Sequence, residues 1–262
     1  MRPNTSRRSL FRDVDLRAIS DDEARKLDGD SVRDVFVGIR PLPGTLDEMN
    51  AAVPILRGGK GQFSSDVKPL SGAKATESSL KALSGAGKRL LHIGTHGFYY
   101  DGTRTAWDKF FGDMQMAPEE LAMHRSGLLF AGAQGPLCQG IRPPADMDDG
   151  VLTAAEIASL DFSGMELTVL SACETALGRI SADGVFGLQR GFKQAGAGAI
   201  LMSLWKVDDK ATAALMTHFY SKWLEGTDKY AALESARRYV ASQPGWSSPD
   251  YWAAFILVDG CR

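Results

Sequence analysis

The chain has 262 residues, of which 44% are hydrophobic and 24% charged, with a formal net charge of -2. Such a chain can bury one large core or two small ones, as an ordinary globular protein does. The near-neutral charge gives no electrostatic reason to expect binding to nucleic acid or to a membrane surface. Because no apolar run approaches the roughly 18 residues that span a bilayer and no secretion signal is recognisable, we expect a cytoplasmic protein.

The cysteines of the chain favour free thiols over structural ones. Cys138, Cys173 and Cys261 are odd in number and have no CxxC spacing. Neither a disulfide framework nor a zinc site is therefore predicted, and free thiols suit a reducing compartment. We expect no metal or other cofactor.

Strand-like apolar runs alternate with helical patterns along most of the chain, which is typical of a mostly parallel sheet covered by helices. Residues 1–34 are expected to form an N-terminal arm with a short helix, and residues 35–262 the main domain. The predicted strands are Val35–Ile39, Arg89–Gly94, Gly127–Ala131, Leu167–Ser171, Ala199–Leu204 and Ala253–Val258.

The predicted helices lie between most of these strands. Thr45 followed by Glu48, and Thr153 followed by Glu156, have the spacing of capping boxes and predict two helix starts. A helix is predicted from about Asp209 to a stop at Gly226, and another begins after Thr227 and ends before Pro244. Segments without a regular pattern are predicted as loops, namely Arg57–Leu70, Tyr99–Glu120 and Gln134–Gly150.

Two predicted strands end in residues that can carry nucleophilic chemistry. The strand Leu167–Ser171 leads to Cys173, and the strand Arg89–Gly94 leads to His96 and Gly97. In open parallel sheets, chemistry gathers beyond the carboxyl ends of the strands. An imidazole that takes the thiol proton creates a thiolate nucleophile and can then protonate a leaving amine. The pair indicates a cysteine–histidine hydrolase, with the N–H groups of Gly97 and Cys173 as oxyanion donors.

Each of these side chains alone also has a structural interpretation. A lone cysteine at a strand end is more often a small buried hydrophobic residue, and a lone histidine is usually structural. His92 lies inside its strand on the same face as His96, and we expect it to be packed or hydrogen-bonded in the core. His124 and His218 fall in helical patterns and receive the same interpretation. What favours catalysis is the pairing of two strand ends, at His96 and Cys173.

Five blocks of sequence occur in an order that is typical of one known family. They read LLHIGTHGFYY, SGLLFAGA, DDGVLTAAEIASLDFSGMELTVLSACETALG, GLQRGFKQAGAGAILMSLWKVDD and YWAAFILVDG, and the similarity to which they belong runs from about Pro41 to Gly260. The chain resembles the CHAT domain, which belongs to the caspase, separase and gingipain clan of cysteine peptidases. The resemblance implies an α/β fold, a caspase-like three-layer α/β/α sandwich with a mostly parallel central sheet. It also implies His96 as base, Cys173 as nucleophile, and Gly97 with Cys173 as oxyanion hole.

The resemblance further points to a substrate pocket after the fifth predicted strand. In clan members this segment forms one wall of the pocket for the residue before the scissile bond. By that analogy Trp205 with Asp208 or Asp209 would receive an Arg or Lys side chain. An aspartate at this position can instead cap the helix that follows. Asp148 and Asp149 are rival candidates, because their loop precedes the strand that leads to the predicted nucleophile.

CHAT domains commonly follow helical repeats, which this sequence lacks. The resemblance therefore implies a protease that cleaves one or a few protein partners, either controlled by a separate protein, of the tetratricopeptide-repeat type or another, or belonging to a longer chain. A catalytically silent interaction module is the alternative, and it predicts loss of a dyad residue, whereas both are present. The glycines from Gly184 to Gly198 suggest a nucleotide-binding domain, but no GxGxxG follows the first strand and no GxxxxGK[ST] occurs.

Overall fold

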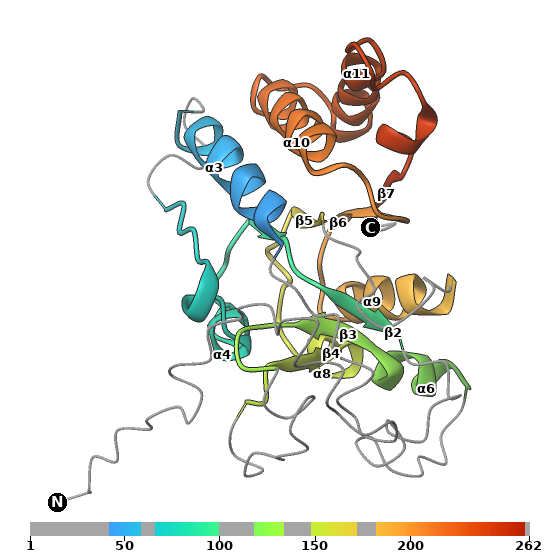
Figure 1. Ribbon diagram of the computed structural model, residues 1–262. Coiled ribbons are helices and arrows are strands. Elements are labelled where there is room, and N and C mark those ends of the chain that lie inside the picture. Colours follow the sequence, from blue (N-terminus) through green and yellow to red (C-terminus); the bar gives the residue numbers. More distant parts are fainter. Residues whose placement is uncertain (1–41, 59–65, 100–117, 134–147, 172–181, 260–262) are drawn as a thin grey trace, which may run out of the picture.

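The computed structural model of the chain (Figure 1) describes residues 42–58, 66–99, 118–133, 148–171 and 182–259. Its α-helices are α3 (Pro43–Gly58), α4 (Glu77–Lys81), α6 (Pro118–Arg125), α8 (Ala154–Ala158), α9 (Ala182–Gln194), α10 (Asp209–Leu224) and α11 (Lys229–Ala241). Its strands are β1 (Leu90–Ile93), β2 (Gly97–Tyr99), β3 (Ser126–Leu129), β4 (Val151–Thr153), β5 (Leu167–Leu170), β6 (Ala199–Ser203) and β7 (Phe255–Asp259). Two short 3₁₀ helices lie at Gly72–Lys74 and Pro249–Tyr251.

A four-stranded sheet with the order β1-β5-β6-β7 forms the centre of the fold. The first three strands run parallel, and β7 is antiparallel to β6. Ile93 of β1 pairs with Leu170 of β5, which in turn pairs with Met202 of β6. Four of the predicted strands are thereby confirmed, and so is a mixed α/β fold with a mostly parallel sheet.

Helices pack on both faces of this sheet, because alternate strand residues point in opposite directions. Val169 and Leu201 face a core with α3, α10 and α11, whereas Ile200 and Met202 face a core with α8 and α9. Figure 1 shows α3, α10 and α11 together on one side of β5 and β6, with α8 and α9 on the other. This arrangement leaves the carboxyl ends of β1, β5 and β6 at one edge.

A second sheet with the order β2-β3-β4 is antiparallel throughout. The predicted strand at Gly127–Ala131 forms as β3, but it lies in this sheet and not in the parallel one. All four residues of β3 are buried, and the predicted run Gly127–Ala131 has no polar side chain, as is typical of a central parallel strand. β2 and β4 have only three residues each, too few for a recognisable alternation.

The two predicted capping boxes have different outcomes. Thr153 caps α8, because its hydroxyl accepts from Glu156 N at 3.2 Å while the Glu156 carboxylate accepts from Thr153 N at 2.9 Å. The other prediction is wrong. α3 already begins at Pro43, a residue whose fixed φ suits the first turn of a helix. The Thr45 hydroxyl donates to Leu42 O at 2.7 Å instead.

The C-terminal helices follow their sequence patterns. Gly226 has a φ of 95°, the left-handed geometry that ends a helix, and it follows α10 as predicted. Asp228 caps α11 by accepting from Tyr230 N at 2.9 Å. No helix in the described ranges is long and apolar enough to cross a membrane. The predicted strand Val35–Ile39 and the boundary after residue 34 lie outside the described residues, so both stay predictions.

Candidate active site

The ends of β1 and β5 lie side by side at one edge of the parallel sheet. Ile93 pairs with Leu170, and Ser171 N donates to Ile93 O at 3.1 Å. His96 follows Ile93 by three residues, and Cys173 follows Leu170 by three. The topology thus directs both chain segments to the same edge. Cys173 itself lies outside the described residues.

His96 stands where the chain leaves the parallel sheet and enters the antiparallel one, between β1 and β2. His96 is 8% exposed, and its backbone oxygen accepts a hydrogen bond from Leu129 N at 2.9 Å. Two residues earlier, a Cβ added to Gly94 would lie 3.0 Å from Thr45 Cβ and 3.5 Å from Ser171 Oγ. The segment that carries His96 therefore passes directly beside α3 and the end of β5.

Gly97 has a backbone N–H that the sheet leaves unused. Facing residues of an antiparallel pair alternate between those that exchange hydrogen bonds and those that do not. Gly97 faces Leu128, while Leu129 N donates to His96 O, so the bonded positions flank Gly97 and its own N–H points away from β3. A Cβ added at Gly97 would meet its nearest described atom, Gly127 O, at 3.7 Å. The described packing would thus tolerate a larger residue there.

His92 is a hydrogen-bonded core residue, as expected from the sequence. Its Nε2 lies 3.1 Å from Ser171 Oγ and 3.1 Å from Glu48 Oε1. Its Nδ1 lies 2.8 Å from the hydroxyl of Tyr220, a fully buried side chain on α10. Both ring nitrogens are therefore engaged by protein groups, and His92 has none left for a substrate.

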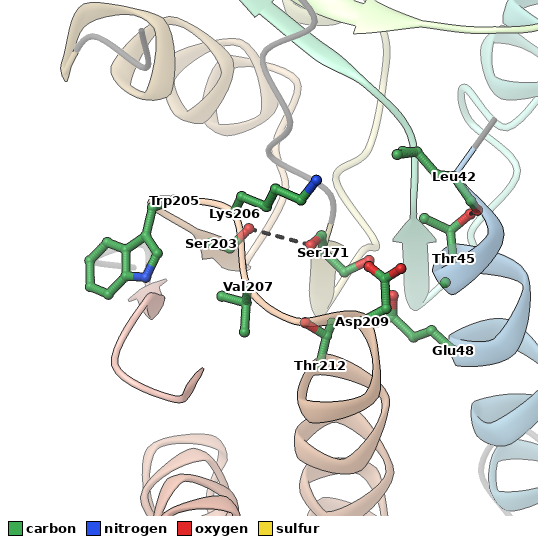
Figure 2. Close-up of a pocket in the computed structure, with 11 residues that line it drawn as sticks. Leu42, Thr45, Glu48, Ser171, Ser203, Trp205, Lys206, Val207, Asp209 and Thr212 are labelled. Carbon is green, nitrogen blue, oxygen red and sulfur yellow. Dashed lines mark hydrogen bonds between the residues drawn. The ribbon is translucent and has the colours of Figure 1, made fainter. Parts of the chain in front are cut away.

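A small pocket opens to solvent beside the ends of β5 and β6. Two carboxylates, Glu48 and Asp209, contribute to it, and Figure 2 shows Glu48 reaching from α3 toward Ser171 with Asp209 beside it. The complete lining consists of Leu42, Gly44, Thr45, Glu48, Ser171, Ser203, Trp205, Lys206, Val207, Asp209 and Thr212. Of the predicted substrate residues, the pocket brings together Trp205 and Asp209.

The two neighbouring aspartates have separate surroundings. Asp208 caps α10, since its Oδ1 accepts from Lys210 N and Ala211 N at 3.0 Å each. The carboxylate of Asp209 lies against the first turn of α3, where a Cβ added to Gly44 would be 2.0 Å from Asp209 Cγ. A negative charge at a helix N-terminus is favourable. Only Asp209 of the pair faces the pocket.

Trp205 lies at the rim of the pocket. It is 37% exposed, and its Nε1 donates to Asp250 O at 3.3 Å. Figure 2 shows its indole turned away from Glu48 and Asp209. The backbone of Trp205 lines the site while its ring contacts the C-terminal segment.

Asp149 lies in a different cluster of charges, at the start of β4. Its Oδ1 accepts from Val151 N at 2.8 Å, and burial raises the pKa of its carboxyl. The neighbouring Asp148 binds Lys81 Nζ at 3.0 Å, and hydrogen bonds from Ser78 and Lys81 outweigh burial and lower the pKa of Asp148. Asp149 is not among the residues that line the pocket.

Glu77 is the buried member of this charge cluster. It is 2% exposed, accepts from Gly150 N at 2.8 Å and forms an ion pair with Lys81. Lys81 also lies 3.3 Å from Glu156. Burial raises the pKa of Glu77 to about 7, against the lowering effect of Lys81. The described residues contain no group of three or more His, Cys, Asp or Glu that could hold a metal ion.

Glu48 is the site residue that sequence reasoning missed. Its spacing from Thr45 predicts only a partner in a capping box. Glu48, Ala52 and Leu56 recur at intervals of four residues on α3, and all three are buried. A carboxylate on the apolar stripe of a helix was the available signal, because such a charge needs a polar partner inside the fold.

Comparison with known proteins places most of the chain in one family. A family model described as CHAT domain matches residues 5–259. Tetratricopeptide repeat protein 28 of Homo sapiens is 31% identical over 202 residues, which are 73% of this chain and 8% of that protein. The Mus musculus protein of the same name is 40% identical over 108 residues, which are 41% of this chain and 4% of that protein. The matched parts are thus less than a tenth of either relative.

Proposed function

The chain belongs to the CHAT domain family, which is associated with the caspase-like peptidase clan, and on that premise we propose that it is a cysteine endopeptidase. Cys173 is the nucleophile and His96 the base, and the substrates are peptide bonds in one or a few protein partners. The observation that carries the proposal is the pairing of Ile93 with Leu170, three residues before His96 and Cys173 respectively.

The proposed reaction proceeds through an acyl-enzyme. His96 takes the proton from the thiol of Cys173, and the thiolate attacks the carbonyl carbon, forming a carbon–sulfur bond. The N–H groups of Gly97 and Cys173 donate to the developing oxyanion, and each such donor contributes roughly 3–4 kcal/mol to lowering the barrier. Collapse breaks the carbon–nitrogen bond as His96 protonates the leaving amine. Water then hydrolyses the thioester, with His96 again as base.

We also propose that the complete domain is a caspase-like three-layer α/β/α sandwich. The helices on both faces of the parallel sheet support this arrangement. In that fold the base and the nucleophile follow neighbouring strands of the parallel sheet, and β1 and β5 are neighbours here.

For specificity, we propose that the pocket beside β5 and β6 receives the Arg or Lys side chain before the scissile bond. Asp209 is the charge partner, and the segment at Trp205 forms a wall. Support comes from the place of Asp209 and Trp205 in one pocket that borders Ser171. Asp208 has no part in this recognition, because its carboxylate caps α10.

Control by a repeat-containing partner or region is part of the proposal. The curated relatives are named tetratricopeptide repeat proteins, and the segment that resembles this chain is a small fraction of each. Repeats of that kind bind protein partners and would restrict cleavage to a chosen substrate. We place this regulated proteolysis in the cytoplasm, where free thiols stay reduced.

The test is hydrolysis of a fluorogenic peptide panel with Arg, Lys, Met or Asp before the reporter. Wild type is compared with Cys173→Ala and His96→Ala. The proposal predicts turnover of Arg and Lys peptides that both variants lose. Turnover that survives in both variants rejects the dyad, and activity on Asp peptides alone rejects the acidic pocket. A wild type that binds a partner protein as tightly as Cys173→Ala does, with no hydrolysis of that partner or of any peptide, supports the silent interaction module.

A further inference from the structure

Four polar side chains from four separate segments meet in the interior beside the pocket. They are Glu48 of α3, His92 of β1, Ser171 at the end of β5 and Tyr220 of α10. Ser171 Oγ donates to Glu48 Oε2 at 2.7 Å, and His92 Nε2 lies 3.1 Å from both Glu48 Oε1 and Ser171 Oγ. The Tyr220 hydroxyl completes the set at 2.8 Å from His92 Nδ1.

Burying these polar groups costs free energy unless they stay hydrogen-bonded to one another. Glu48 is 3% exposed and Tyr220 is fully buried, and burial together with the Glu48 charge raises the pKa of the Tyr220 phenol. A buried carboxylate is tolerated only with hydrogen-bond partners, and apolar residues in its place would often stabilise the fold equally well. The contacts of the network join α3, β1, the end of β5 and α10 at one point.

Ser171 is the residue that this geometry holds. Its N donates to Ile93 O at 3.1 Å, its O accepts from Ser203 Oγ at 3.3 Å, and its hydroxyl binds Glu48 and His92. Every polar group of Ser171 is thus tied to the protein. It is the last described residue before Cys173, which follows two residues later.

We propose that Glu48 is a positioning residue that, through Ser171, fixes the start of the chain segment carrying Cys173. The proposal rests on the nucleophile role proposed for Cys173. Because Cys173 is two peptide units from Ser171, a shift of the anchor displaces the thiol directly. Misplacement of a reacting group by about 1 Å can lower a rate by roughly 10²-fold.

The experiment compares Glu48→Gln, Ser171→Ala and Ser171→Thr with wild type. Glu77→Gln is the matched control, because Glu77 is an equally buried carboxylate in the cluster around α4 and β4. The readouts are kcat, KM and the melting temperature, with amide hydrogen exchange over residues 172–181. The first two variants are expected to lose about tenfold to 10²-fold in kcat with little change in KM, and to exchange faster. Ser171→Thr keeps the hydroxyl and should retain most of kcat, and the control should keep kcat and exchange unchanged.

The outcomes separate this proposal from the proposed function. Unchanged kcat and hydrogen exchange in Glu48→Gln and Ser171→Ala would overturn the positioning role of Glu48. An inactive Cys173→Ala would at the same time leave the peptidase assignment intact. A rise in KM confined to Arg and Lys peptides would also overturn the positioning role, because Glu48 would then contact the substrate. If Cys173→Ala keeps turnover, the peptidase assignment fails, and the exchange data alone decide whether Glu48 orders the segment.

Discussion

Ile93 and Leu170 are paired across the parallel strands β1 and β5, at the last position of each strand. His96 follows Ile93 by three residues in the sequence, and Cys173 follows Leu170 by three. Parallel strands place their carboxyl ends at the same edge, so β1 and β5 both end at the edge from which the chain continues toward His96 and Cys173. Five predictions follow from this arrangement and from its surroundings.

His96 and His218 are expected to respond differently to replacement by alanine. His96→Ala removes the proposed proton carrier and should lower kcat/KM for peptide hydrolysis by about 10²–10⁴-fold. His218 lies between α10 and α11, 2.9 Å from Ser235 Oγ and stacked on Tyr239. His218→Ala should lower the melting temperature and leave kcat/KM unchanged. Equal losses of activity in the two variants would mean that His96 acts only through stability.

Gly97→Ala should impair catalysis without impairing folding. The added methyl group meets no described atom closer than 3.7 Å, but it narrows the approach of a substrate carbonyl to the Gly97 N–H. The fall in kcat should approach the roughly 10²–10³-fold loss that follows removal of one oxyanion donor. Thermal denaturation and steady-state kinetics on the same preparation check both parts.

Gly191→Ala is the control for the Gly97→Ala variant. A Cβ there would lie 2.5 Å from Ala154 O, between α9 and α8. Overpacking of this kind destabilises by about 1–3 kcal/mol, so the variant should melt earlier while its folded fraction keeps kcat. A Gly97→Ala variant with full kcat would remove Gly97 from the oxyanion hole.

Asp209→Asn should reduce the preference for basic side chains, and Asp208→Asn should not. A hydrogen bond to a charged group contributes about 1.5–3 kcal/mol, so loss of the Asp209 charge should lower kcat/KM for Arg peptides about 10-fold to 150-fold relative to Met peptides. Asparagine caps a helix as well as aspartate does, so Asp208→Asn should keep both stability and specificity. An unchanged Arg-to-Met ratio in Asp209→Asn would assign Asp209 to the N-terminus of α3 alone.

The charge cluster around Glu77 predicts a pH dependence of stability. The pKa of Glu77 is about 7 in the folded protein and 4.5 as a free side chain. The folded protein therefore binds the Glu77 proton more tightly than the unfolded chain does. The stability that this proton contributes is fully present below pH 4.5 and is lost as the pH rises to about 7. Glu77→Gln cannot ionise, so it should escape that loss.

Chemical denaturation of wild type and Glu77→Gln at pH 5 and pH 7.5 measures the effect. From pH 5 to pH 7.5, the unfolding free energy of Glu77→Gln should rise relative to that of wild type by about 1 kcal/mol or more. The nearby charges of Lys81, Asp148 and Glu156 are common to both proteins and largely cancel in the difference. A difference that is independent of pH would show that Glu77 titrates at an ordinary carboxyl pKa.

The parallel sheet could be predicted from the sequence because its strands are apolar runs with clear ends. Leu167–Leu170 and Ala199–Ser203 are entirely buried, and each has a single polar residue in an otherwise apolar run. The same pattern in β3 concealed its membership of another sheet, because a four-residue buried strand reads alike in either setting. β2 and β4 were missed because three residues carry no period.

The positions of His96 and Gly97 in the fold could be predicted, because both residues follow the end of β1. The site was not predictable where polar residues meet by tertiary packing. Glu48 and Ser171 are 123 residues apart in the sequence, and no local pattern links them. Asp208 and Asp209 are adjacent and chemically identical, and only the start of α10 at Asp209 decides which one caps the helix.

The central claim is that Cys173 and His96 form a working dyad, and thiol alkylation measures it most directly because no substrate is needed. Wild type and His96→Ala are treated with iodoacetamide from pH 5 to pH 9, and mass spectrometry reports labelling of Cys138, Cys173 and Cys261. The account predicts that Cys173 is labelled fastest, at a pH below the ordinary thiol pKa of about 8.5, and that His96→Ala removes this advantage. Labelling of Cys173 at the rate of the other two thiols, or at a rate unaffected by His96→Ala, would contradict it.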